Sequence, residues 1–113
     1  MDARLPAHSE AFGLIRQVQA AGGFGTVLQK GERDAGTIIV VLTESGRNAR
    51  VYERLPSLDG SRSWHLSKQQ SAENPMEVTE YLERRANQDR DTWIVELDIA
   101  HGERFIGLST GTA

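Results

Sequence analysis

Hydrophobic residues near the start of the chain recur at the spacing of an amphipathic helix. They lie three or four positions apart and comprise Ala7, Ala11, Leu14, Ile15, Val18 and Ala21. Pro6 suits the first turn of such a helix, where its missing N–H costs nothing. Gly22 and Gly23 follow, and glycine readily adopts the left-handed conformation that ends many helices. The pattern therefore predicts a helix from Pro6 to Ala21.

The pattern then changes to the period of β-strands. Residues 24–30 have the sequence FGTVLQK, and the turn-forming segment GERDAG separates them from the apolar run TIIVVLT at residues 37–43. We expect these two segments to form a hairpin, with the second as a central strand covered on both faces. Residues 49–55 alternate between apolar positions and basic or aromatic ones. They predict a third strand with one solvated, basic face.

The second half of the chain predicts one more helix and three short strands. WHLSK at residues 64–68 follows a turn-rich segment and predicts a short strand. A capping arrangement at Asn74 starts a helix, which its apolar spacing carries to Gln88. DTWIVELDI at residues 91–99 predicts a strand, and RFIGL at residues 104–108 predicts a short edge strand.

Together these elements predict an α+β fold. We expect an antiparallel sheet of about five strands with two helices packed mainly on one face. The predicted order is one helix, four strands, one helix and two strands. The length of 113 residues suits a single domain. We expect this domain to span residues 1–108 and residues 109–113 to be a frayed tail, because STGTA has little apolar surface to bury.

Composition and charge narrow the function classes. The chain has no cysteine, which removes a disulfide frame and a thiolate nucleophile and suits the reducing cytoplasm. It has no apolar run near the roughly 20 residues that span a bilayer, and its first residues lack the pattern of a signal peptide. The net charge of -3 disfavours general binding to nucleic acid. We therefore expect a cytoplasmic protein that does not bind membranes.

A glycine-bearing segment, AAGGFGTV, partly matches the phosphate-binding loop of protein kinases. Gly22, Gly25 and Val27 occupy the last three fixed positions of that loop, but Ala20 replaces the first glycine. The strand that follows has no lysine, and the chain contains no H-R-D, D-F-G or Walker A motif. We interpret the segment as a helix end followed by a strand.

Three segments resemble a known but uncharacterised family. They are RLPAH before the first helix, GGFGTVLQKGERDAG at residues 22–36, and WIVELD at residues 93–98. In these segments the chain resembles a family of short bacterial proteins that is known only as a domain of unknown function. The resemblance covers most of the chain and implies a single domain. It implies no activity, ligand, cofactor or catalytic residue.

Acidic residues near the C-terminus form a candidate metal site. Glu96 and Asp98 lie two positions apart on a predicted strand and therefore share a face, and His101 and Glu103 follow them. Two carboxylates and an imidazole could hold Mg²⁺ or Mn²⁺ for phosphoester hydrolysis. The alternative is a charged, solvated strand face, which the usual exposure of acidic residues favours.

A basic and aromatic stripe forms a second candidate site. Arg50, Tyr52 and Arg54 share one face of the third predicted strand, and Lys30 and His65 could join them from neighbouring strands. Such a stripe could stack on a single-stranded base and pair with phosphate. The alternative is a solvated face whose arginines pair with acidic residues of the sheet or of the second helix.

These observations favour a binding protein over an enzyme. We expect a small non-catalytic binding or protein-interaction domain of the cytoplasm that uses no cofactor. A protein partner or self-association is compatible with this interpretation, and a homodimer could form if an edge strand such as RFIGL pairs across a two-fold axis. A metal-dependent phosphodiesterase or nuclease at Glu96, Asp98 and His101 and a single-stranded nucleic-acid binder at the stripe remain the alternatives.

Overall fold

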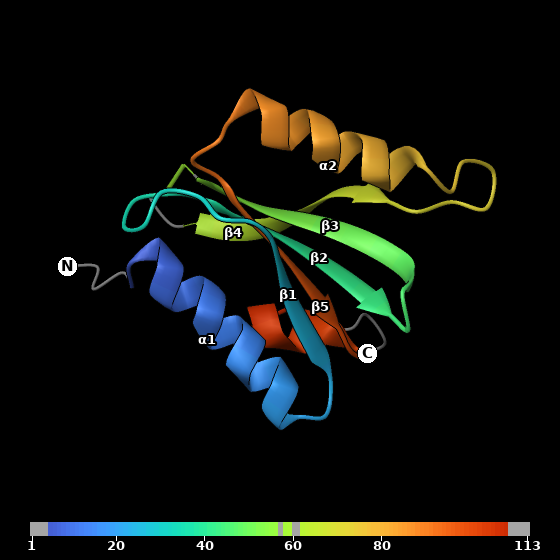
Figure 1. Ribbon diagram of the computed structural model, residues 1–113, viewed down its shortest axis with the longest axis horizontal. Coiled ribbons are helices and arrows are strands. Elements are labelled where there is room, and N and C mark those ends of the chain that lie inside the picture. Colours follow the sequence, from blue (N-terminus) through green and yellow to red (C-terminus); the bar gives the residue numbers. More distant parts are fainter. Residues whose placement is uncertain (1–4, 57, 60–61, 109–113) are drawn as a thin grey trace.

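The computed structural model describes residues 5–56, 58–59 and 62–108 and has an α+β fold, as predicted (Figure 1). In chain order the elements are α1 (Ala7–Ala20), β1 (Phe24–Gln29), β2 (Ile38–Glu44), β3 (Arg47–Pro56), β4 (Arg62–Gln69), α2 (Glu77–Gln88), β5 (Trp93–Asp98) and the 3-10 helix η1 (Gly102–Ile106). The predicted boundaries of both helices hold to within three residues. The predicted tail at residues 109–113 lies outside the described residues.

The first helix ends where its glycines predict. Gly22 has a φ angle of 95°, in the left-handed region that glycine adopts without a steric penalty. The N–H of Gly23 donates to the carbonyl oxygen of Val18 at 2.9 Å, and the N–H of Gly22 donates to that of Gln19 at 3.1 Å. These bonds satisfy carbonyl groups that the end of a helix leaves without partners. The kinase-like segment is therefore a helix end that leads into β1.

The loop between β1 and β2 caps the other end of α1. The N–H groups of Ala7 and His8 donate to carbonyl oxygens of this loop at 3.0 and 2.9 Å. The Glu32 carboxylate accepts the N–H of Asp34 at 2.8 Å and so shapes the loop. The indole N–H of Trp93 donates to the Glu32 carbonyl oxygen at 2.7 Å. The loop therefore joins the start of α1 to the start of β5.

The strand order differs from the predicted one. The order across the sheet is β1-β5-β2-β3-β4, so β5 separates β1 from β2 and the predicted hairpin between those two strands is wrong. The β2–β5 pair is parallel, while the other pairs are antiparallel as predicted. Every residue of β2 from Ile38 to Thr43 is buried, as are four of the six residues of β5. The two most apolar strands therefore occupy neighbouring central positions, where both faces are covered.

The two helices lie on opposite faces of the sheet, so the prediction that they share one face is wrong (Figure 1). Ile38, Val40 and Leu42 of β2 pack in one cluster with buried residues of α1. Ile39 and Val41 point the other way and pack with α2. An unbroken apolar strand exposes apolar side chains on both faces, and each face needs its own cover. We call the two sides the α1 face and the α2 face.

The segment RFIGL does not form the predicted edge strand. Residues 102–106 form η1, which packs on the α1 face with Ile106 buried. Gly102 lies so close to the sheet that a Cβ atom there would stand 2.9 Å from Leu42 Cδ2. Because these residues form no strand, the predicted route to self-association through RFIGL has no basis in this fold.

The faces of the sheet are covered unequally. On the α1 face, α1 packs against β1 and β5, and η1 packs against β2. On the α2 face, α2 packs against β3 and β4 and leaves β1 open. Phe24 and Leu28 of β1 consequently expose 73% and 48% of their surface. Among the described residues, no helix is long and apolar enough to cross a membrane.

Candidate functional site

The basic stripe on β3 is bound by acidic residues of the same chain. The Arg50 guanidinium donates to both carboxylate oxygens of Glu103 in η1, from Nε and Nη2, at 2.8 Å each. The Tyr52 hydroxyl donates to Glu103 Oε2 at 3.0 Å. Hydrogen bonds from Arg50 lower the pKa of Glu103, while burial is the main cause that raises the pKa of Tyr52. Arg50 is only 6% exposed, so the expectation of a solvated basic face is wrong here.

Arg54 forms a second ion pair on this face of β3. Its guanidinium donates to Glu10 of α1, with Nη2 to Oε1 at 2.7 Å, and its Cζ lies 4.8 Å from the centre of the Trp64 ring. The acidic partners therefore come from α1 and η1 and not from the sheet or the second helix. Both arginines fasten the covering elements to β3, which is a structural role for the stripe.

The structure does not bring Lys30 or His65 to this stripe. Lys30 is exposed just after β1, and β5 and β2 lie between it and β3. His65 pairs in register with Glu53, which places it on the α2 face of β4, opposite to the stripe. Its ring Nε2 lies 3.4 Å from the Ser63 hydroxyl. The predicted five-residue site is therefore divided among three places.

A second ion-pair cluster fastens α2 to the other side of β3. Arg85 Nη2 donates to Glu53 Oε1 at 2.8 Å, and the Tyr81 hydroxyl donates to the other oxygen of the same carboxylate. Burial raises the pKa of Glu53, but the hydrogen bonds from Tyr81 and Arg85 outweigh it and the pKa falls below its usual value. Nearby, Lys68 of β4 pairs with Glu77 of α2 at 2.9 Å.

The predicted metal ligands do not form one site, and each has a different structural environment. The Asp98 carboxylate accepts the N–H groups of Ser45 and Gly46 at 2.7 and 3.0 Å and so caps the turn between β2 and β3. His101 is exposed in a left-handed backbone conformation beyond β5. In the part of the chain that the structure describes, no group of three His, Cys, Asp or Glu side chains could hold a metal ion together.

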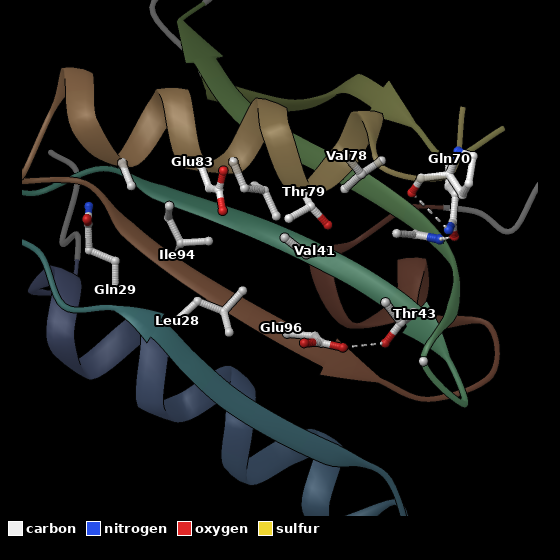
Figure 2. A pocket seen from close by; sticks show the side chains of 15 residues that line it. Leu28, Gln29, Val41, Thr43, Gln70, Val78, Thr79, Glu83, Ile94 and Glu96 are labelled. Atoms are coloured by element: carbon white, nitrogen blue, oxygen red, sulfur yellow. Dashed lines mark hydrogen bonds between the residues drawn. The ribbon is translucent and has the colours of Figure 1, made fainter. Parts of the chain in front are cut away.

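Glu96 belongs instead to a groove on the α2 face, which we call the α2 groove (Figure 2). Its volume is about 410 Å³. The floor consists of Val41 and Ile94, the wall of Val78 and Leu82, and the outer rim of Leu28 on β1. The groove forms because α2 covers only one part of the sheet and leaves a corner beside β5 and β1.

Two glutamines border the groove at its opposite ends, as Figure 2 shows. The Gln29 amide donates to the carbonyl oxygen of Thr92 at 2.8 Å. The Gln70 Oε1 accepts the N–H of Ala49 at 3.1 Å. Each side chain is held by a backbone group of another segment. The shape of the groove is therefore fixed by hydrogen bonds as well as by packing.

Glu96 differs from the other half-buried or buried carboxylates of the described residues. Those of Glu10, Glu53, Glu77 and Glu103 each pair with a Lys or Arg. Those of Glu44 and Asp98 accept backbone N–H groups. Glu96 accepts only the Thr43 hydroxyl, at 3.0 Å, and has neither kind of partner within the described chain. The groove thus contains a carboxylate beside which the described part of the chain places no cation.

Sequence reasoning placed Glu96 at a candidate site but missed the groove. The groove joins residues 28, 41, 78 and 94, which are far apart in the sequence. One signal was present in β1, whose sequence FGTVLQ has apolar side chains on both faces. Val27 packs into the core on the α1 face, so Phe24 and Leu28 indicate that the other face also offers apolar surface.

Comparisons with known proteins give one family and several solved structures. The model of a family described as "Protein of unknown function (DUF1491)" matches residues 5–107. A crystal structure of a DUF1491 family protein from Caulobacter crescentus CB15 has 30% identity and a TM-score of 0.79, over 92% of this chain and 96% of that chain. An NMR structure of a DUF1491 family protein from the same source has 30% identity and a TM-score of 0.75, over 91% and 93%.

A third structure extends the comparison to another organism. The solution structure of protein Atu0922 from A. tumefaciens has 28% identity and a TM-score of 0.74, over 93% of this chain and 94% of that chain. No curated protein matches the sequence significantly. The matches cover nearly the whole described fold on both sides of each comparison.

Proposed function

The chain belongs to the DUF1491 family, whose function is unknown, and we propose that it is a non-catalytic interaction module that binds an extended segment of a partner protein. The membership confirms the resemblance to an uncharacterised family that the sequence indicates. The binding surface in this proposal is the α2 groove together with the neighbouring edge of β1. The half-covered α2 face is the observation on which the proposal rests.

The apolar surface of this face supports a partner. Leu28 forms the rim of the groove, and Phe24 continues the exposed apolar surface along the same side of β1. Transfer of apolar surface from water is worth about 25 cal/mol per Å². A partner segment that covers both Leu28 and Phe24 therefore gains more binding free energy than a ligand that is confined to the groove. This extended surface favours a protein segment over a small molecule.

The edge of β1 supports an extended segment in particular. β1 lies at one end of the sheet, and its residues Phe24–Gln29 include no charged residue and no proline. Natural sheets usually protect their edges with such residues. The opposite edge strand, β4, has Arg62, His65 and Lys68. An uncharged edge beside a groove is the arrangement that strand addition uses, with the backbone for affinity and side-chain pockets for specificity.

The register of β1 limits where the segment pairs. A bulge in the β1–β5 ladder lies between Val27 and Gln29. Regular pairing with an added strand is therefore expected along Phe24–Val27, and the bulged Leu28 lies next to the groove. A cytoplasmic, bacterial setting completes the proposal, because the chain has no cysteine and the similar structures are bacterial.

A selection from a random peptide library displayed on phage tests this function. We expect peptides that bind the wild-type protein to lose binding to Thr79→Trp, because Thr79 lines the groove and an indole there fills it. The matched control is Gln17→Trp, which adds the same side chain at an exposed position of α1. Peptides that bind Thr79→Trp as tightly as the wild type, or a selection that yields no binder, would refute the proposed function.

A further inference from the structure

We infer that the α2 groove selects a cationic side chain, a lysine or arginine of the bound segment, and that Glu96 is its counter-ion. This inference rests on the proposed function, because it specifies the chemistry of the segment that the groove binds. It concerns one position of that segment, the one whose side chain enters the groove over the floor formed by Val41 and Ile94.

The charges of the lining support this choice. Among the described residues, the groove is lined by two acidic side chains, Glu96 on β5 and Glu83 on α2, and by no Lys, Arg or His. Figure 2 shows Glu83 directed from α2 toward the sheet, with Glu96 on the strand below. Within the described residues neither carboxylate forms an ion pair. A segment with an acidic side chain at this position would be repelled, and a cation would be attracted.

The apolar lining supports a long cationic side chain. Lysine and arginine bury their aliphatic stems against apolar surface and keep the charged group at a polar site. Leu28 and Ile94 offer the apolar contact, and Glu96 lies beside them on the same face. The Thr43 hydroxyl bonds to Glu96 Oε2, which orients the carboxylate. The groove therefore combines a place for the stem with a counter-ion for the head.

The same charges argue against a second copy of this chain as the occupant. In strand addition between two copies along Phe24–Val27, the paired residues include no basic side chain, and the exposed Lys30 lies beyond them. This pairing would also place the Glu96 and Glu83 groups of both copies on one continuous face. A basic segment of another protein satisfies the carboxylates, while self-pairing leaves them unpaired.

Two isosteric small probes test the inference without a known partner. Cyclohexylmethylammonium and cyclohexylmethanol share an apolar ring and differ in charge. In titrations followed by NMR of the methyl groups of Leu28, Val41 and Ile94, we expect the ammonium probe to bind about fivefold more tightly. This ratio corresponds to an ion pair near the upper end of the range for partly exposed pairs. We expect the preference to shrink as salt is added.

Two matched variants assign the preference to Glu96. Glu96→Gln removes the charge and retains an oxygen that can accept the Thr43 hydroxyl, so we expect it to abolish the preference for the ammonium probe. Glu80→Gln removes the same charge from an exposed site of α2 outside the groove lining, and we expect it to retain the preference. A far-ultraviolet circular dichroism spectrum and a melting curve of each variant establish that both are folded.

The outcomes separate this inference from the proposed function. Equal binding of both probes to the wild type, or a preference that survives Glu96→Gln, overturns the cation site and leaves the groove as a binding surface. Binding of neither probe overturns the cation site and also counts against the groove. Loss of the preference in Glu80→Gln as well would assign it to the general charge of α2 and would overturn the role of Glu96.

Discussion

The ion pair between Arg50 and Glu103 gives the sharpest stability prediction. The two side chains are 8% and 13% exposed, so they are largely shielded from water. In Glu103→Leu, Arg50 loses two charge-assisted hydrogen bonds of 2.8 Å and, among its bonds to described residues, keeps the one to the Asn48 carbonyl oxygen. The Tyr52 hydroxyl also loses its acceptor. The substitution therefore leaves a buried positive charge without its counter-ion.

The magnitude follows from this geometry. Removing one partner of a buried pair costs about 3–5 kcal/mol, and the residual exposure of this pair places the loss near the lower end, at about 3 kcal/mol. At about 4 °C per kcal/mol for a domain of this size, the melting temperature should fall by about 12 °C. Adding Arg50→Met should restore much of this loss, because no unpaired charge then remains.

Urea unfolding measures both variants through the fluorescence of Trp64 and Trp93. The matched control is Glu77→Leu, which breaks the pair with Lys68. Because those side chains are 35% and 27% exposed, the control should lose less than about 1 kcal/mol. A loss in Glu103→Leu no larger than in the control would refute the shielding argument. So would a double variant that is less stable than Glu103→Leu alone.

The remaining predictions concern pH and the glycines. The folded-state pKa values of Glu103 and Glu53 are lowered, so their stabilisation is fully present above the ordinary Glu pKa of about 4.3 and is lost as the pH falls through the lower folded values. The urea concentration at the unfolding midpoint should therefore decrease as the pH is lowered through that range, and Glu103→Gln should make this decrease smaller. If the pH dependence of the midpoint is unchanged in Glu103→Gln, the assignment of the effect to Glu103 is contradicted. Gly22→Ala should cost about 1 kcal/mol, because a Cβ meets no atom within 4 Å and only the positive φ is strained. In thermal melts Gly13→Ala should instead stabilise the helix by about 0.5–1 kcal/mol. Equal stability changes in Gly22→Ala and Gly13→Ala would show that backbone conformation does not determine the cost of replacing these glycines. Gly25→Ala should destabilise by about 1–3 kcal/mol in the same melts, because its Cβ would lie 2.7 Å from Ile15 Cγ2; a neutral result would show that α1 shifts without cost.

Local structure followed from local sequence. The spacing of apolar residues in α1 and the glycines after it gave the helix and its end, because both depend on residues within a few positions. The five strands also formed where alternation, an unbroken apolar run or flanking turn residues predicted them. The exception was RFIGL, whose short apolar pattern fits a strand or a helical turn. In the structure these residues belong to a compact 3-10 helix, and Gly102 at its start lies so close to Leu42 that a Cβ there would stand 2.9 Å from Cδ2.

The candidate sites depended more on tertiary structure. The stripe of Arg50, Tyr52 and Arg54 was correctly placed on one strand face, but its acidic partners come from positions 10 and 103, far from it in the sequence. Glu96 and Asp98 were identified together, yet Asp98 caps a turn and Glu96 borders the groove. Pairing across such distances leaves no periodic signal, so charge and spacing alone could not separate these roles.

The sequence by itself determined the helices, the boundaries of all five observed strands to within two residues, the α+β class and the family. Helices and strands could be predicted because periodicity and turn residues act over short distances. Only the tertiary structure decided that β5 separates β1 from β2, that the helices cover opposite faces, and that a groove remains beside β1. The physical reason is that β2 and β5 are apolar on both sides. They must lie in the centre under two layers, and a single helix on the α2 face is too narrow to cover the whole sheet.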